Sequence, residues 1–333
     1  MQILIHIGTH KTATTFIQNI LWLEREALYH FGILYPEAGY FNGAHHKLGD
    51  SLINDMDCNV MKKVVNPIFN TIADIPWWQE FVQELHEKRP AKVLISSEEF
   101  EWYSRPSDLA KFLASALPGY QIKIAVCLRP QEEYVESLYQ EFVRYFKVRE
   151  TRSLQAALGD MRFADYDILL ERWAAAFGWR SLKVTRFDDL KASGLIAGYV
   201  DFLELPVSLI PLFEKKQKQA VDVTKKSLPA VCIEFLRLCN MIPLPPNRHN
   251  RIVKALYDVS ESLVKKYGPN CKRILSPKAR LEIRTRFYES NERVRSRFFP
   301  KEESLFPRQD EAPLTSTASM QDLIPLLVRQ GLI

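Results

Sequence analysis

The 333-residue chain is 47% hydrophobic and 26% charged, which is ordinary for a folded globular protein and excludes a chain that is disordered throughout. Its net charge of +5 is mild and the basic residues are widely spread, so the composition does not indicate a nucleic-acid-binding surface but suits a small anionic ligand. The five cysteines lack C-x-x-C spacing, which favours reduced thiols over a disulfide framework or a zinc site.

The first residues predict a buried strand, a turn and a helix start in immediate succession. Residues 3–7 are an apolar run of strand length, Gly8 can turn, and apolar positions near helical spacing follow from Thr14 to about Phe31. An ammonium and three hydroxyls come together with the unpaired N–H groups of the new helix. We therefore expect an anion cradle formed by Lys11, Thr12, Thr14 and Thr15.

The cradle is not the nucleotide-triphosphatase loop, because that motif needs a glycine directly before the lysine and position 10 is His10. The run Lys11-Thr12-Ala13-Thr14-Thr15 instead resembles the 5′-phosphosulfate loop of the sulfotransferases, commonly K-[ST]-G-T-T after a strand. Ala13 departs from that pattern, since its Cβ disfavours conformations that glycine adopts freely. The alternative interpretation is a Lys- and Thr-rich N-cap on an ordinary helix.

Two groups of candidate acid–base residues follow along the chain. His45 and His46 are adjacent, so at most one would face a given site, and both suit surface or capping roles equally well. A second short strand within residues 91–100 ends in Glu98 and Glu99, at the edge where ligands lie in open α/β sheets. Alternatively, these two acids cap a helix.

A third strand, Ile122–Leu128, ends in Arg129, and a helix with Ser137 follows. In the sulfotransferases a strand-end arginine and a serine eight residues later hold the donor's 3′-phosphate, and Arg129 with Ser137 has that spacing. A guanidinium binds phosphate with two hydrogen bonds, although arginines in surface ion pairs are also common. No aspartate ends this strand, which weakens the interpretation as a P-loop kinase.

The remaining sequence predicts how the fold is completed. A fourth strand, residues 182–187, makes a mostly parallel sheet covered on both faces by helices. Residues 214–226 are Lys- and Gln-rich and indicate a solvated connection. A helix is predicted from Leu281 to Phe298, and Asn291 lies on its apolar face, where it needs a partner. We expect a P-loop-like three-layer α/β domain over 1–300, helical over about 215–300, and a C-terminal extension with a short helix over 301–333. A C-terminal stretch with Arg286, Asn291 and Pro300 again resembles bacterial sulfotransferase-like proteins.

The resemblance implies transfer of a sulfuryl group from 3′-phosphoadenosine 5′-phosphosulfate to an acceptor hydroxyl or amine, without metal. It implies that His10, Lys11, Thr12, Ala13, Thr14, Thr15, Arg129 and Ser137 bind the donor. Lys11 would stabilise the leaving phosphate oxygen, and the acceptor proton would go to His45, His46, Glu98 or Glu99, with a histidine favoured because its pKa is nearest neutrality.

Two other function classes stay open, a Mg²⁺-dependent small-molecule kinase and a non-catalytic nucleotide-binding or scaffold protein. The acceptor is not readable from the sequence, and a carbohydrate is a family-level expectation. We expect a small-molecule nucleotide as partner, no nucleic acid and no stable membrane insertion, and a cytoplasmic location, because no apolar run reaches eighteen residues and the first residues are unlike a signal peptide. The oligomeric state is open.

Overall fold

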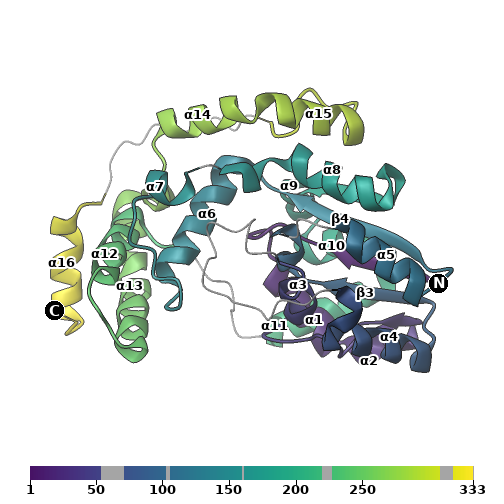
Figure 1. Ribbon diagram of the computed structural model, residues 1–333. Coiled ribbons are helices and arrows are strands. Elements are labelled where there is room, and N and C mark those ends of the chain that lie inside the picture. Colours follow the sequence, from purple (N-terminus) through teal and green to yellow (C-terminus); the bar gives the residue numbers. More distant parts are fainter. Residues whose placement is uncertain (54–70, 103–105, 160, 220–226, 308–317, 333) are drawn as a thin grey trace. The chain divides into compact units, whose positions relative to one another are not determined.

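The computed structural model describes residues 1–53, 71–102, 106–159, 161–219, 227–307 and 318–332. The chain divides into two compact units (Figure 1). The first comprises Met1–Arg129, Asp165–Thr224 and Arg293–Pro300, and the second Pro130–Ala164, Lys225–Glu292 and Lys301–Ile333. The predicted boundary at residue 300 is also a junction between units, but the predicted extension falls in the same unit as residues 225–292. The division into 1–300 and 301–333 stays a prediction.

The first unit is built on a five-stranded, all-parallel sheet with β1 at its centre. The strand order is β2-β3-β1-β4-β5. Ile5 of β1 pairs in register with Ile95 of β3 on one side and with Ile124 of β4 on the other. The sheet and its flanking helices form the expected P-loop-like α/β fold. Its strands are β1 (Gln2–His6), β2 (Ile33–Leu34), β3 (Lys92–Ser96), β4 (Gln121–Leu128) and β5 (Leu182–Arg186).

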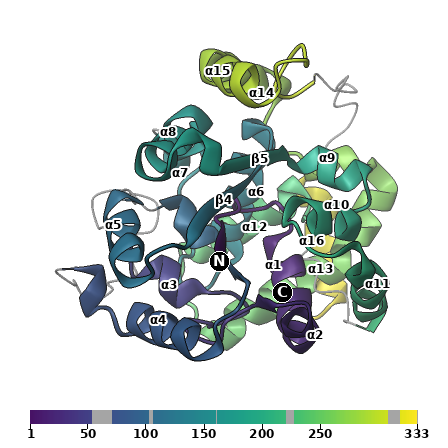
Figure 2. The same cartoon turned by 90° about the vertical axis from the view of Figure 1, so that its right-hand side faces the viewer.

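Helices cover both faces of the sheet, which explains why its strands are nearly continuous apolar runs (Figure 2). On one face Leu4 and Leu94 share a core with Tyr199 and Phe213. This face is covered by α1 (Thr14–Leu23), α2 (Arg25–His30), α9 (Phe187–Ala192), α10 (Leu195–Phe202) and α11 (Ile210–Gln219). The other face carries α4 (Pro76–Lys88), α5 (Pro106–Ala116) and α8 (Tyr166–Phe177).

Short elements complete the first unit. Two of them, α3 (His46–Asp50) and η2 (Glu98–Trp102), contact each other, and η2 follows the carboxyl end of β3. The others are η1 (Ile72–Asp74), η4 (Trp179–Ser181) and η5 (Val207–Leu209).

The second unit is helical. Its elements are α6 (Gln131–Arg144), α7 (Leu154–Leu158), η3 (Met161–Ala164), α12 (Ala230–Asn240), α13 (Pro246–Tyr267), η6 (Pro269–Lys272), α14 (Pro277–Arg286) and α16 (Met320–Arg329), while α15 (Tyr288–Phe298) begins in this unit and ends in the first. The side-chain amides of Gln131 and Asn291 exchange two hydrogen bonds of 2.7 and 3.1 Å. The prediction that Asn291 has a polar partner is confirmed.

Some predicted elements differ from the structure. The helix expected from Thr14 to Phe31 is interrupted at Glu24, where φ is −106°, and that expected from Leu281 to Phe298 is interrupted at Phe287. The segment 214–219, predicted as a solvated connection, is exposed at Glu214, Lys215 and Gln217, but it is helical and belongs to α11, which the buried Phe213 anchors in the core. Residues 54–70 and 220–226 lie outside the described residues. None of the described helices is long and apolar enough to cross a membrane.

Candidate functional site

The loop between β1 and α1, residues 8–13, is where the sequence predicts an anion site, and we call it the anion loop. Three of its residues have left-handed backbone conformations, with φ of 54° at Gly8, 71° at Lys11 and 62° at Ala13. A Cβ at Gly8 would lie 2.8 Å from the Thr14 methyl group, so a glycine is required there. Ala13 therefore has the left-handed conformation that the glycine of the common motif adopts freely, and its Cβ does not prevent that conformation. The N–H groups of Thr14 and Thr15 precede the first hydrogen bonds of α1, which run from Phe16 and Ile17 to the Ala13 carbonyl, and such N–H groups can bind an anion.

Side chains from the surrounding elements hold the carbonyl groups of the anion loop. Thr12 Oγ1 donates to Thr9 O (2.7 Å), Arg129 Nη1 donates to Lys11 O (2.9 Å), and the hydroxyl of Tyr199 donates to Thr12 O. Thr9 Oγ1 in turn donates to Cys127 O of β4 (2.8 Å). The loop conformation is therefore fixed without any ligand. Thr12 is fully buried and its hydroxyl donates its proton to Thr9 O. The hydroxyl therefore stabilises the loop conformation.

The predicted donor-binding residues are distributed over both units. Arg129 ends β4 beside the loop, and its backbone oxygen accepts a 2.6 Å hydrogen bond from Tyr166. Thr14 is buried and Thr15 is exposed at the start of α1. Ser137 lies on α6 in the second unit, so its pairing with Arg129 stays a prediction.

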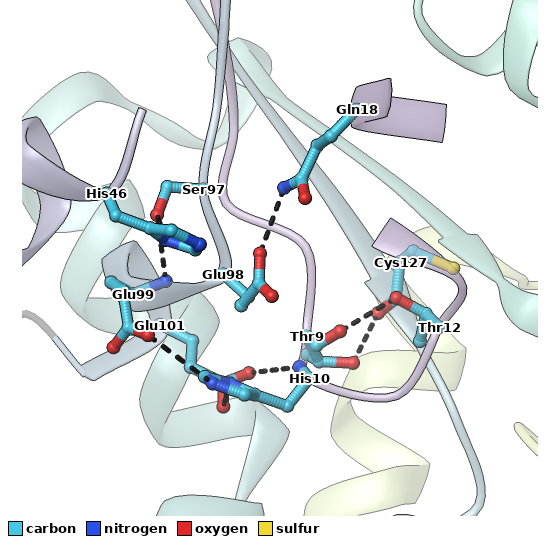
Figure 3. A network of polar contacts seen from close by, with 10 residues as sticks. All are labelled: Thr9, His10, Thr12, Gln18, His46, Ser97, Glu98, Glu99, Glu101 and Cys127. Atoms are coloured by element: carbon cyan, nitrogen blue, oxygen red, sulfur yellow. Dashed lines mark hydrogen bonds and ion pairs between the residues drawn. The ribbon is translucent and has the colours of Figure 1, made fainter. Parts of the chain in front are cut away.

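His10 forms a buried ion pair with Glu101, a contact that the sequence did not predict (Figure 3). Glu101 Oε1 accepts from His10 Nδ1 (2.6 Å), and Oε2 accepts from the His10 backbone N–H (3.0 Å). Burial alone would lower the pKa of His10, but the charge and hydrogen bond of Glu101 raise it to about 10. His10 is thus an imidazolium at neutral pH. Two of its three N–H donors belong to Glu101 rather than to a bound anion.

Two further carboxyl groups, those of Glu98 and Glu99, lie beside His10 and differ in whether they are ionised at neutral pH (Figure 3). Glu98 accepts a 2.9 Å hydrogen bond from Gln18 Nε2; burial would raise the pKa of Glu98, but His10, His46 and Gln18 hold it below its usual value. Burial raises the pKa of Glu99 to about 8 against the attraction of His10. At neutral pH Glu98 is ionised, whereas Glu99 is mainly protonated.

The two adjacent histidines have different surroundings, as expected. His45 is fully buried, and its Nε2 donates to Pro36 O (3.0 Å) while its Nδ1 accepts from Ser96 N (3.1 Å). Both ring nitrogens hold backbone groups and burial lowers the pKa of His45 to about 4, which argues against His45 as the base. His46 instead contacts the residues that follow β3, since its Nδ1 lies 3.0 Å from Ser97 Oγ.

Sequence reasoning missed several residues of the site. Asp50 lies four residues after His46 on α3, a spacing that places both on one helix face and was a usable signal. Burial and the charge of Glu98 raise the pKa of Asp50. Glu101 and Tyr199 carry no local signal, because their partners are 91 and 187 residues away in the sequence.

The described residues contain no group of three or more His, Cys, Asp or Glu side chains that could hold a metal ion. Four of the five cysteines, at 127, 232, 239 and 271, are free thiols, and Cys58 lies outside the described residues.

Comparison with known proteins gives a structural resemblance but no sequence match. No protein-family model and no curated protein sequence matches the chain. Among solved structures, a sulfotransferase from Alicyclobacillus acidocaldarius matches with 17% sequence identity and a TM-score of 0.40, over 75% of this chain and 99% of that one. The fold and the anion loop described above rest on the chain's own geometry.

The left-handed conformation at position 13 predicts the effect of Ala13→Gly. A left-handed residue other than glycine costs about 1–2 kcal/mol, and glycine's greater freedom in the unfolded chain returns part of that gain. We expect Ala13→Gly to raise the free energy of unfolding by up to about 1 kcal/mol in denaturant titrations. The control Ala175→Gly, at an exposed position inside α8, should lower it by about 1 kcal/mol. Equal losses in both variants would contradict the assigned conformation.

The buried His10–Glu101 pair predicts how stability depends on pH. The folded-state pKa of His10, about 10, lies above its ordinary value of 6.5, so its contribution is complete below pH 6.5 and is lost as the pH rises through 10. We expect the free energy of unfolding of the intact protein to fall over this range relative to His10→Gln. The exposed-site variant His30→Gln should follow the intact protein. Parallel curves for intact protein and His10→Gln would disprove the shifted pKa.

Proposed function

We propose that this protein is a sulfotransferase that transfers the sulfuryl group of 3′-phosphoadenosine 5′-phosphosulfate to an acceptor hydroxyl or amine. The observation that carries the proposal is the anion loop. It follows the central strand, leads into the N-terminus of α1, and adopts left-handed conformations at Lys11 and Ala13, within a motif that resembles the phosphosulfate loop. A carbohydrate acceptor and a cytoplasmic location belong to the same proposal and rest on the sequence alone.

Each donor group has an assigned partner in this proposal. Lys11 and the first-turn N–H groups at Thr14 and Thr15 bind the 5′-phosphosulfate. Arg129, whose guanidinium already reaches the Lys11 carbonyl, binds the 3′-phosphate together with Ser137, which is assigned by its spacing in the sequence.

The reaction breaks the bond from sulfur to the bridging phosphate oxygen and forms a bond from sulfur to the acceptor oxygen or nitrogen. The electron pair of the broken bond stays on the phosphate, where the charge of Lys11 stabilises it as adenosine 3′,5′-bisphosphate leaves. The acceptor proton passes to a basic side chain. The candidates are Glu99, whose Oε1 lies 3.8 Å from His10 Nε2, together with Glu98 and His46.

A Mg²⁺-dependent kinase is the second candidate, and one observation favours it. Glu98 follows β3, the neighbour of β1, and it is ionised and hydrogen-bonded to Gln18 on α1. P-loop enzymes place a metal-binding carboxylate near their phosphate loop. The sequence shows no such residue at the end of β4, but Glu98 supplies a carboxylate just after β3, on the other side of β1.

The choice of donor tests the proposed function. Purified protein should release adenosine 3′,5′-bisphosphate from 3′-phosphoadenosine 5′-³⁵S-phosphosulfate in excess EDTA, when offered sugars, phenols and amines as acceptors. ATP with Mg²⁺ should give no transfer to the same acceptors. Transfer from ATP alone would establish the kinase, and tight binding of the bisphosphate without turnover for any acceptor would establish a binding protein.

Replacing Lys11 tests its role in the transfer step. Lys11→Ala retains a Cβ, so the backbone cost of the left-handed conformation is unchanged and only the ammonium is lost. Because that charge matters most as negative charge develops on the bridging oxygen, we expect turnover at saturating donor to fall about 100-fold to 1000-fold. Calorimetry should show a smaller loss of bisphosphate affinity. Lys88→Ala, on the surface of α4, is the matched control. Normal turnover in Lys11→Ala would remove Lys11 from the mechanism.

A further inference from the structure

The ion pair between His10 and Glu101 joins the anion loop to the segment after β3. His10 is 8% exposed and Glu101 is 7% exposed, and both carboxylate oxygens of Glu101 bind His10, one at the ring and one at the backbone. Because the Glu101 carboxylate accepts hydrogen bonds from both the ring and the backbone N–H of His10, it holds the imidazole and the backbone of the loop in place. The Trp102 ring, 5.2 Å away between centroids, packs against the same imidazole. The ring orientation of His10 is therefore set by contacts on several sides.

The second ring nitrogen of His10, Nε2, faces the carboxyl group of Glu99. His10 Nε2 lies 3.8 Å from Glu99 Oε1, which is within ion-pair range but longer than a hydrogen bond (Figure 3). The other oxygen of Glu99, Oε2, is buried and has no hydrogen-bond partner among the described residues. A buried carboxyl oxygen without a partner is costly, and an acceptor hydroxyl bound there would satisfy it.

The backbone, rather than the carboxyl group, holds Glu99 in place. Its N–H donates to Ser97 Oγ (3.2 Å). Helix α3 packs closely on it, since a Cβ at Gly49 would lie 2.8 Å from the Glu99 Cβ. The side chain is 13% exposed, so the carboxyl group is enclosed without being sealed from solvent. Glu99 is anchored in a way that leaves its carboxyl group available.

Charged groups on three elements act on the ionisation of Glu99. His10 of the anion loop lowers its pKa, whereas Asp50 of α3 and Glu98 and Glu101 of η2 act with burial to raise it. A base is most effective when its pKa lies near the working pH, and an ordinary glutamate is a much weaker base than a group titrating above neutrality.

Within the proposed sulfotransferase function, we propose that the His10–Glu101 ion pair is a positioning pair that keeps Glu99 beside the anion loop, so that Glu99, rather than a histidine, takes the acceptor proton. As the bond from sulfur to the acceptor oxygen forms, that oxygen's proton moves to the Glu99 carboxylate, and the bisphosphate leaves with the electron pair of the broken bond. His10 stays protonated throughout. Glu99 is the catalytic residue, and His10 and Glu101 act through it and through the loop.

The test compares Glu99→Gln, His10→Gln and Glu101→Gln with Glu87→Gln, a surface variant on α4, using the full chain. The rate is measured as ³⁵S-labelled product or sulfate released from the donor, with the best acceptor of the donor screen or with water. Affinity for adenosine 3′,5′-bisphosphate is measured by calorimetry. Both are followed against pH.

We expect the intact protein and Glu87→Gln to gain rate with a midpoint near pH 8. Glu99→Gln should lose about 100-fold to 10,000-fold in rate and should lose this pH dependence, with bisphosphate affinity at neutral pH nearly unchanged, because Glu99 is uncharged there. Since ionised Glu99 repels the anionic ligand, affinity in the intact protein should fall as the pH rises through the same midpoint, and Glu99→Gln should abolish that fall.

The positioning pair has its own signature. His10→Gln removes the cation that lowers the Glu99 pKa, so the rate midpoint should move to higher pH. Glu101→Gln keeps one acceptor oxygen and should lose about tenfold in bisphosphate affinity, as expected for one charge-assisted hydrogen bond. Glu101→Asp, which keeps the charge, should recover part of that loss and replaces Glu101→Gln if the latter does not fold.

The outcomes separate this inference from the proposed function. If the intact protein transfers sulfuryl groups while Glu99→Gln keeps its rate and pH profile, the inference is wrong and the function stands. If His10→Gln leaves the rate midpoint unchanged, the pair does not act through Glu99. If the intact protein binds the bisphosphate but transfers to no acceptor or water, both the function and the assignment of the base are wrong.

Discussion

The attachment of the anion loop to both neighbours of the central strand is the constraint on which the site depends. β1 is hydrogen-bonded in parallel to β3 and β4, so the residues that follow it emerge between the ends of those strands. On the β4 side Thr9 binds the carbonyl of Cys127, and on the β3 side His10 binds Glu101. Each attachment spans about a hundred residues of sequence, and together they fix the loop before any ligand arrives.

Buried acidic side chains have different partners in the two units. In the second unit Glu136 accepts from the Leu275 N–H (2.9 Å) and from Arg280 (3.0 Å), and Glu132 accepts from Arg284 (2.6 Å). These carboxylates are matched by cations and N–H groups, as buried charges in structural roles usually are. In the first unit four acids gather around one imidazolium, and Glu99 keeps an oxygen without a partner. Such a mismatch is more common at chemical sites than at structural ones.

Four of the five strands, and the place of the loop after the first of them, were predictable because their signals are local, whereas the two-residue strand β2 was not predicted. Residues 3–7 have an apolar run and a following glycine, and the run Lys11–Thr15 places its hydroxyls at a helix start. The interruptions at Glu24 and Phe287 were not predictable, because neither position carries glycine or proline. The choice between His45 and His46 was open for another reason. Their spacing shows that they face apart, but only the tertiary contacts of His45 with Pro36 and Ser96 show which one is enclosed.

Ala13 has a consequence for how the site is inherited. Every alanine codon is one base change away from a glycine codon, so glycine at this position is easily reached by mutation. Alanine restricts the backbone more than glycine does, and its left-handed conformation is imposed here by the bonds to Thr9, Lys11 and Thr12 carbonyls. The entropy of ordering the loop is thus lost when the chain folds, not when the ligand arrives. A single base change therefore suffices to replace the restricted backbone of alanine by the freer one of glycine, while the same three hydrogen bonds still hold the loop.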